Sequence, residues 1–320
     1  MPLLTNDPSP VAAGADATRP ASPKADGPGL ALGAGAYLLW GLFPAFWPLL
    51  RPAGPFEILG HRLAWTFVVM SALALALGRW RVLRQLPARG WLLVGAAAVL
   101  IAVNWATYIY AVNSGQVVES ALGYFVNPLF SVLLGVVVLR ERLRIAQWVA
   151  LAVAGGAVVV LTVDYGRVPL IALTLAVSFG LYGLIKKTVP LDSASSLTAE
   201  GVVLAPVAVA YLVWLQWTGS GTFTGHGIGH VLLLMAAGPI TAVPLLLFGG
   251  AARRVPLVTI GILQYLAPIL QFAWGVLVVH EEMPASRWLG FGLVWAALVI
   301  FTVDGLRAAH RSRTAAAARS

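Results

Sequence analysis

The sequence predicts an all-α membrane protein of ten transmembrane helices, arranged as two inverted five-helix repeats with both termini cytoplasmic. Three observations predict this class. The chain is too apolar for a soluble globule, its basic residues gather in alternate connections, and its second half repeats its first.

Composition excludes most soluble protein classes. Of the 320 residues, 59% are hydrophobic and 10% are charged, and the mean hydropathy is +0.86. A soluble domain carries about 25% charged residues, so this chain lacks the polar surface that a soluble enzyme or a nucleic-acid-binding protein needs. The net charge of +9 is instead typical of the cytoplasmic face of a membrane protein. The absence of cysteine excludes disulfides, thiol catalysis and thiolate metal sites.

The predicted elements follow one another with short polar breaks. Residues 1–29 are rich in Pro, Ala, Asp and Gly, which predicts a disordered cytoplasmic tail and no signal peptide. Ten apolar runs follow, each about long enough to span a bilayer. We place them at 30–50, 56–78, 91–112, 117–139, 145–164, 168–186, 197–217, 230–250, 256–279 and 287–306. Residues 307–320 are basic and alanine-rich, and we expect a frayed or disordered cytoplasmic tail.

The distribution of basic residues predicts the orientation. With the N-terminus inside, 17 of the 21 Lys and Arg residues fall in cytoplasmic segments. The external loops hold only Arg51, Arg167 and Arg287, and Arg62 lies within a predicted helix. Because basic residues near helix ends are retained in the cytoplasm during insertion, this asymmetry predicts that both termini are cytoplasmic.

An internal repeat divides the predicted membrane part into residues 30–164 and 168–306. Residues 122–164 and 262–304 align at a constant offset of 140, and the matches include Pro128 with Pro268, Gly135 with Gly275, Glu141 with Glu281 and Trp148 with Trp288. Five helices is an odd number, so the second copy enters the membrane in the opposite orientation. An inverted repeat is the architecture that alternating access requires. Duplication for stability alone and a channel are the alternatives.

The fourth and ninth predicted helices carry matching polar faces around a proline. The members, at helical spacing, are Tyr124, Pro128, Ser131 and Gly135, and then Gln264, Pro268, Gln271 and Gly275. Each proline removes one N–H and clashes with the carbonyl four residues earlier. We therefore expect kinks that act in gating and faces that point inward. A packing seam of small residues is the alternative.

Five titratable residues in or near the apolar runs are candidates for charge pairing or proton coupling: Glu57, His61, Arg62, Glu119 and Glu200. An arginine inside a span costs at least about 2.5–3.5 kcal/mol, so Arg62 needs a partner or a wet cavity. We expect it to bind an anionic or polar group, with Glu119 as a candidate partner. Glu57 and His61 lie one turn apart and can pair, and Glu119 or Glu200 are candidate proton relays. Snorkelling into the headgroups is the alternative for these groups.

Polar and aromatic residues within the spans complete the candidate solute site. Beside Arg62, we expect solute contacts from Trp40, Asn104, Tyr108, Tyr124, Asn127, Tyr182, Gln264 and Tyr265. Aromatic rings offer surfaces to apolar or cationic solutes, although rings in spans also form lipid-facing belts. No nucleotide-binding loop and no metal-ligating motif occurs in the sequence, so we predict neither an ATP-driven motor nor a metal or other cofactor.

Several short motifs, in their order and spacing, carry a family resemblance. They include Trp40-Gly41, His61-Arg62, Asn104-Trp105, the stretch 122–128 and the stretch 264–268. Together they resemble the EamA family of the drug/metabolite transporter superfamily, and within it the RarD-type permeases, a group labelled chloramphenicol-sensitive proteins. The resemblance covers about residues 30–306 and implies a bacterial plasma-membrane permease for small organic molecules. Trp47-Pro48 stands where such relatives often carry a basic residue, so no role of that charge transfers to this chain.

We therefore expect a secondary transporter that moves a small metabolite or drug-like solute across the plasma membrane by alternating access. Its expected partners are the solute and the lipid bilayer, with protons as the candidate coupling ion and a homodimer as a compatible assembly. Nucleic acid is not an expected partner. The alternatives are an intramembrane lipid-modifying enzyme and a passive channel. An enzyme needs a nucleophile or general base with an orienting partner, and the sequence presents no such constellation.

Overall fold

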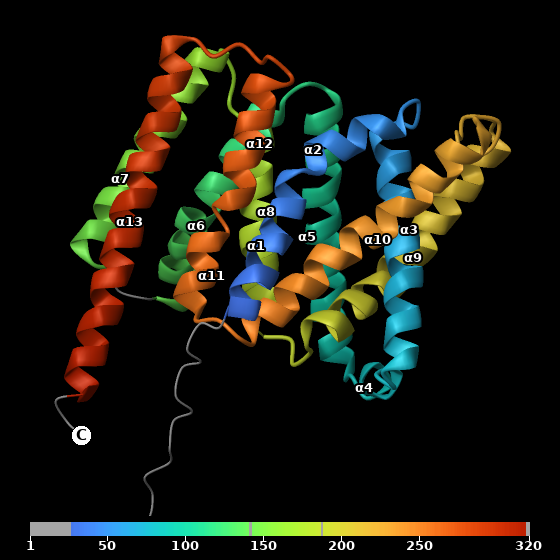
Figure 1. Cartoon of the computed structure of the whole chain (residues 1–320), viewed down its shortest axis with the longest axis horizontal. Helices are drawn as coiled ribbons and strands as arrows, with labels where there is room; N and C mark the ends of the chain where they lie inside the picture. Colours follow the sequence, from blue (N-terminus) through green and yellow to red (C-terminus); the bar gives the residue numbers. More distant parts are fainter. Residues whose placement is uncertain (1–26, 141–142, 187, 318–320) are drawn as a thin grey trace, which may run out of the picture.

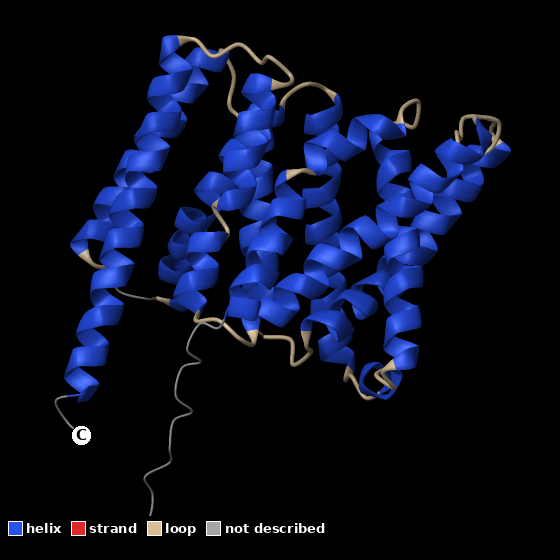
Figure 2. Ribbon diagram, in the orientation of Figure 1, coloured by secondary structure: helices blue, strands red, loops and turns tan. Residues whose placement is uncertain are grey.

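The computed structural model describes residues 27–140, 143–186 and 188–317, and the regular elements in these ranges are all helices (Figure 2). The predicted N-terminal tail over 1–26 lies outside the described residues. So do Glu141, Arg142, Lys187 and residues 318–320, which the repeat and the charge count include.

The helices follow the predicted apolar runs closely. In chain order they are α1 (Gly27–Gly41), α2 (Phe43–Phe46), the 3-10 helix η1 (Trp47–Leu50), α3 (Pro55–Ala76), α4 (Trp80–Arg84), α5 (Ala88–Asn113), α6 (Val117–Leu139), α7 (Ile145–Tyr165), α8 (Leu170–Lys186), α9 (Ser193–Trp217), α10 (Gly227–Ala252), α11 (Leu257–Leu263), α12 (Leu266–Leu277) and α13 (Ala285–Ala317).

Eight segments in the described part of the chain are long and apolar enough to cross a membrane, with α11 and α12 together supplying one of them. The pair formed by α1 with α2 and η1, bent by 42°, is a ninth. The remaining apolar helix, α8, has 17 residues. At 1.5 Å per residue it is about 26 Å long, which is shorter than the hydrocarbon core of about 30 Å. The described part of the chain therefore supports eight or nine of the ten expected spans.

Successive long helices run in alternating directions, so the connections lie at two opposite ends of the molecule (Figure 1). The α4 end, at the bottom of the view, holds the start of α1, helix α4 and the C-terminal end of α13. The η1 end, at the top, holds η1 and the connections α5–α6, α7–α8, α9–α10 and α12–α13. The sparse basic residues Arg51, Arg167 and Arg287 all belong to the η1 end.

Helix contacts in the first half have counterparts in the second. Helix α1 packs on α10 and α12, and its counterpart α8 packs on α5 and α6. Helix α3 contacts α9 and α10, while α9 contacts α3 and α5. The pairs α7–α13 and α6–α12 each join one helix to its own counterpart. These contacts are thus matched when the two sets of helices are exchanged.

Two close helix approaches depend on glycine. A Cβ on Gly238 of α10 would lie 2.5 Å from the backbone carbon of Trp65 in α3. A Cβ on Gly123 of α6 would lie 2.8 Å from the carbonyl oxygen of Ala172 in α8. Glycine lets backbones approach where any side chain would clash, so these positions hold α10 close to α3 and α6 close to α8.

The two predicted proline kinks differ in outcome. Helix α6 continues through Pro128, with no break in its helical assignment. The matching segment is interrupted at Gln264 and Tyr265, between α11 and α12. Gln264 is four residues before Pro268, at the carbonyl that Pro268 cannot bond. The polar face around Pro128 is also only partly inward, because Ser131 is exposed, whereas Gln271 and Gly275 are buried.

The C-terminal prediction needs a correction. Helix α13 continues to Ala317, so residues 307–317 are helical, and the disorder we expected there is wrong. A run of alanine and arginine has high helix propensity, and α13 simply extends beyond its apolar part. At the N-terminus, α1 begins at Gly27, three residues before the predicted span.

Candidate solute-binding site

Arg62 lies in the interior of the helix bundle among aromatic rings. It is on α3, it is 2% exposed, and Gly238 allows the neighbouring helix α10 to approach. The guanidinium carbon is 3.8 Å from the ring centre of Trp105 and 4.9 Å from that of Trp47. The ring of Phe43 is 5.5 Å away. Such cation–π contacts stabilise a desolvated cation by about 2 kcal/mol or more.

No carboxylate faces Arg62 among the residues that the structure describes. Its Nε donates to Thr241 Oγ1 at 3.0 Å, and Nη1 has no hydrogen-bond partner. The titratable side chains that interact electrostatically with the Arg62 guanidinium are Tyr124 and Tyr108. The expected pairing with Glu119 is therefore wrong. A buried charge without a counter-ion costs several kcal/mol, which makes this guanidinium a candidate for binding an anion.

A hydrogen-bond network links α5, α6 and α8 next to this arginine. Asn104 Nδ2 donates to the Leu175 carbonyl and to Ser178 Oγ, each at 3.1 Å. Tyr124 donates its hydroxyl to Asn104 Oδ1 at 3.2 Å. Tyr108 packs edge-on against Tyr124, and its buried hydroxyl has no partner. Three of the predicted solute contacts are thus brought together by the fold, and one of them has a free polar atom.

The second buried charge, Glu200 on α9, has a full set of partners. Lys186 at the end of α8 is 2.8 Å from Glu200 Oε1 and also contacts Ser196 Oγ. Ser196 Oγ donates to the same oxygen at 3.2 Å, and the Tyr182 hydroxyl is 3.3 Å from Oε2. Glu200 is 1% exposed. The predicted residues Tyr182 and Glu200 therefore belong to one closed cluster near the α4 end, away from Arg62.

Glu57 and His61 do not pair with each other, contrary to our expectation. Glu57 Oε1 accepts the backbone N–H of Thr222, in the α9–α10 connection, at 2.6 Å. His61 stacks on Phe223 at 4.8 Å between ring centres, and neither of its nitrogens has a hydrogen-bond partner. Both side chains instead attach this connection to the start of α3, Glu57 through a backbone hydrogen bond and His61 through ring stacking.

Glu119 belongs to a group of ion pairs at the η1 end. It pairs with Arg167 at 2.7 Å, and it accepts the N–H of Ile171 at 3.0 Å. Nearby, Arg287 pairs with Asp164 at 3.0 Å. Glu281 accepts the N–H of Val117, at the start of α6, at 2.6 Å. Burial raises the pKa of the Glu281 carboxyl, whereas the hydrogen bonds from the backbone N–H groups of Val118 and Val117 act to lower it.

The remaining predicted residues belong to α1, to α6 and to the break between α11 and α12. The Trp40 carbonyl accepts from Gln271 Nε2 at 3.1 Å, and the Trp40 ring packs on Tyr37 and Phe248. Gln264 and Tyr265 form the break itself, and Tyr265 packs on the cluster that includes Phe125 and Phe291. Asn127 is half-buried, with Oδ1 lacking a partner. None of these four side chains is joined to Arg62 by a described contact.

The predicted site lacks six residues that surround the arginine or complete the acid cluster: Phe43, Trp47, Trp105, Thr241, Lys186 and Ser196. Phe43 and Trp47 are four residues apart and so share one helical face, which is a signal that the sequence does contain. Thr241 is 179 residues from Arg62, and only the fold brings the two together.

The geometry can be compared with known proteins. The model of the EamA-like transporter family matches residues 27–163 and again residues 167–303. The two matches together cover most of the chain. The chain belongs to the EamA-like transporter family. A solved crystal structure with 19% sequence identity, which covers 87% of this chain and 98% of its own, has the same fold at a TM-score of 0.58.

Curated relatives of this EamA-family chain are named as transporters or as RarD. Protein RarD of Streptomyces exfoliatus is 55% identical over 89% of this chain and 91% of its own length. An uncharacterized transporter of Bacillus subtilis, YojE, is 41% identical over 87% of this chain and 95% of its own. Protein RarD of Escherichia coli is 37% identical over 89% and 97%. These names indicate a membrane transporter and point away from an enzyme.

Proposed function

We propose that this protein is a ten-span permease of the bacterial plasma membrane that moves a small organic solute by alternating access. The solute binds at Arg62, between the two halves of the chain. The single observation that carries the proposal is a buried guanidinium with a free Nη1 and no facing carboxylate in the described residues. A permanent structural charge would have a fixed counter-ion, whereas a binding site leaves that place to the solute.

The repeated architecture supports alternating access. The family model matches twice at a constant offset of 140 residues, and the main helix contacts of one half have counterparts in the other. Two equivalent halves in opposite orientation give two packings of similar energy, one open to each side. Helices α3 and α9 are counterparts in direct contact, and they carry Arg62 and Glu200 from opposite ends. A relative rocking of these helices would expose the arginine to each side in turn.

Proton coupling is assigned to the carboxylates that the fold buries. Glu200 is held by Lys186, Ser196 and Tyr182 near the α4 end, and Glu119 is held by Arg167 near the η1 end. Protonation of either carboxylate removes the charge that holds its cation, which loosens the contacts at that end. In this proposal, one carboxylate contact at each end of the molecule couples proton movement to opening.

The test uses the native absence of cysteine. Ile58 and Thr66 lie one turn on either side of Arg62 on the same face of α3, and both are buried. We expect single-cysteine variants Ile58→Cys and Thr66→Cys to react with a membrane-impermeant thiol reagent, each mainly from its own side of oriented vesicles. A reagent that locks one side open should protect the other position. Simultaneous labelling of both positions from one side would favour a passive channel.

The orientation has its own test. A reporter fused after Ser320 should lie in the cytoplasm, and one inserted near Gly221, at the η1 end, should lie outside. Both reporters on the same side of the membrane would contradict the ten-span arrangement.

A further inference from the structure

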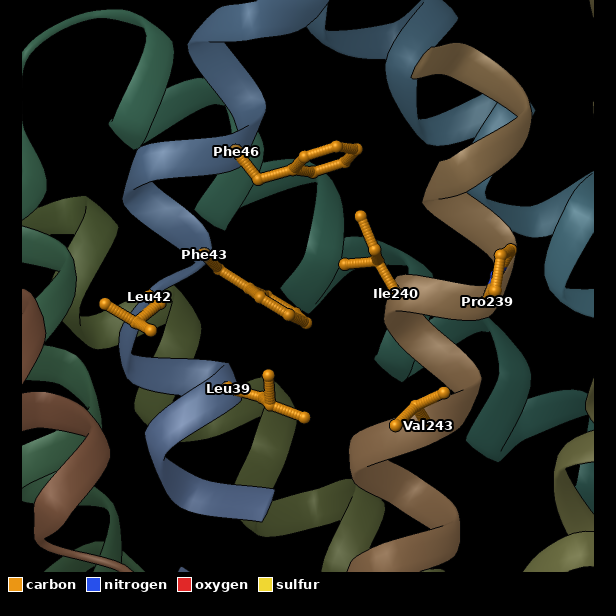
Figure 3. A pocket seen from close by; sticks show the side chains of 7 residues that line it. All are labelled: Leu39, Leu42, Phe43, Phe46, Pro239, Ile240 and Val243. Atoms are coloured by element: carbon orange, nitrogen blue, oxygen red, sulfur yellow. The ribbon is translucent and has the colours of Figure 1, made fainter. Parts of the chain in front are cut away.

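An apolar groove lies between the bent first span and α10 (Figure 3). Its cavity volume is about 340 Å³, and its walls include Leu39, Phe43, Phe46, Ile240 and Val243. Leu42 and Val243, at its rim, are 48% and 45% exposed on the outer surface of the helix bundle. Exposed apolar side chains on the flank of a membrane helix bundle contact lipid, so we infer that the groove opens toward the bilayer.

Phe43 joins this groove to the arginine. Its side chain points into the space between the two helices in Figure 3, and its ring centre is 5.5 Å from the Arg62 guanidinium carbon. On the opposite wall, Ile240 lines the groove, and the next residue, Thr241, accepts the hydrogen bond from Arg62 Nε. The groove and the buried cation are therefore separated by a single aromatic ring.

The chain bends beside that ring. Leu42 separates α1 from α2, and the two parts of the span meet at 42°. Phe43 is the first residue of α2, directly after the bend, so a change in this angle turns its ring relative to α1. A short hinge next to a separating side chain is an arrangement that lets a ligand pass from the groove to the cation.

The polar atoms near the arginine define the ligand's charge. Arg62 Nη1 and the Tyr108 hydroxyl are buried and lack partners, and both donate hydrogen bonds. No acidic side chain in the described ranges faces them, so nothing is available to bind an ammonium group. The site therefore favours one negative charge over a neutral group, a zwitterion or a cation.

We propose that the solute is an apolar monocarboxylate, whose carboxylate binds Arg62 and whose hydrocarbon body lies in the groove. This assignment rests on the proposed function of the Arg62 site and adds the substrate class. A planar guanidinium matches a carboxylate with two parallel hydrogen bonds, and the groove removes the hydrocarbon body from water. The solute enters sideways from the bilayer, past Phe43, after its apolar body has partitioned into the membrane.

The experiment measures binding to the purified full-length protein in detergent by isothermal titration calorimetry, with protein-free micelles as the blank. The probes are hydrocinnamate, its neutral amide, the zwitterion phenylalanine and the short carboxylate acetate. We expect hydrocinnamate to bind at least about tenfold more tightly than each of the other three, because each lacks one of the two recognised features or adds an unpaired charge. Equal binding of hydrocinnamate and its amide would overturn the proposal, and this comparison needs no variant.

Two matched variants assign the two parts of the ligand. Val243→Trp places a bulky ring in the groove on an exposed wall, and it should weaken hydrocinnamate at least about tenfold while leaving acetate unchanged. Leu232→Trp is the control, because Leu232 is on the same helix and 57% exposed but does not line the groove. Arg62→Gln should weaken hydrocinnamate to the level of the amide. Unchanged hydrocinnamate binding in Val243→Trp or in Arg62→Gln would contradict the assigned pose.

Failure of this inference is separable from failure of the proposed function. If hydrocinnamate binds no better than its amide while Ile58→Cys and Thr66→Cys are labelled alternately, the substrate class is wrong and the permease stands. If hydrocinnamate binds through Arg62 but the labelling does not alternate, the site is assigned correctly and alternating access is wrong.

Discussion

Two of the buried charges, Glu200 near the α4 end and Arg62 in the interior of the bundle, differ in how completely they are neutralised. Glu200 has a lysine at 2.8 Å and hydroxyl groups from Ser196 and Tyr182 around its carboxylate. Arg62 has three aromatic rings and one hydroxyl, and its Nη1 is free. The two residues sit on counterpart helices, α3 and α9, which pack against each other.

This difference separates a structural contact from a binding site. The Glu200 cluster joins the end of α8 to α9. Glu200 Oε1 already accepts a hydrogen bond from Lys186, so this oxygen is occupied and does not bind a ligand. In the Arg62 site, Nη1 is buried without a partner, so a ligand can accept its hydrogen bond. A substitution at Glu200 or Lys186 should therefore lower stability in addition to its effect on proton coupling, whereas a substitution at Arg62 should lower transport without lowering stability.

The largest expected effect is at Arg62. Loss of one partner from a buried charged contact in a complex costs about 2–5 kcal/mol, which corresponds to about thirtyfold or more in affinity. Arg62→Ala should therefore remove protein-dependent uptake of hydrocinnamate into proteoliposomes, while the protein still reaches the membrane. Arg62→Lys should restore only part of the uptake, because lysine lacks the planar fork. Full uptake by both variants would make Arg62 a structural residue.

The second prediction converts the open site into a closed one. Thr241 Oγ1 is 3.0 Å from Arg62 Nε, so Thr241→Asp places a carboxylate beside the guanidinium. We expect uptake to fall at least about tenfold, because the new carboxylate competes with the solute, while the melting temperature is kept or raised. Thr241→Val is the control: it removes a hydrogen bond to a charged group, a loss of about 1.5–3 kcal/mol, without adding a competitor. Equal uptake in the aspartate variant and the wild type would show that no anion binds there.

The third prediction concerns the neutralised charge. Removing one partner from a buried ion pair costs about 3–5 kcal/mol, and the 23% exposure of the Lys186 side chain puts Lys186→Met at the low end of that range. The variant should melt several degrees lower. The double variant Lys186→Met with Glu200→Gln should recover much of the loss, since no unpaired charge remains. A double variant as unstable as the single one would mean that the unpaired Glu200 carboxylate is not the cause of the loss.

The smallest effect is expected at the two prolines, which test whether the halves exchange roles at the two ends. Replacing either proline supplies the backbone N–H that proline lacks, and replacing Pro268 also removes the clash at the break between α11 and α12. Pro128→Ala and Pro268→Ala should bias the protein toward opposite facing states, each by about tenfold, or 1.4 kcal/mol. The readout is labelling of cysteine at Ile58 and Thr66. Labelling that shifts the same way in both variants would remove the prolines from gating.

Local sequence patterns predicted the helices well and their neighbours poorly. An apolar run of about 20 residues fixes a helix by composition alone, and an arginine inside such a run stands out against it. Arg62 was therefore found from sequence. The predicted pairing of Arg62 with Glu119 was wrong, because helical periodicity indicates which face of a helix a residue is on but not which helix lies opposite that face. Glu119 is at the start of α6, where Arg167 of the α7–α8 connection is closer.

The prolines give the same lesson for backbone geometry. Pro128 and Pro268 occupy equivalent places in the repeat, and the local rule predicts the same kink for both. Only the segment with Pro268 is broken, at Gln264 and Tyr265, whereas α6 stays continuous. Tertiary contacts differ at the two places, since α6 packs tightly on α8 through Gly123. This contact is between helices distant in sequence, so the residues around Pro128 alone do not predict it.

The most direct test of the difference between the two charges is the melting temperature of Arg62→Met, measured beside wild type and Lys186→Met. An unpaired buried charge costs several kcal/mol, which the aromatic rings and Thr241 offset only in part. If Arg62 is kept for a solute, Arg62→Met should melt at or above the wild-type temperature while it loses uptake of hydrocinnamate. A fall as large as that of Lys186→Met, with uptake retained, would contradict the assignment of Arg62 as the solute-binding charge.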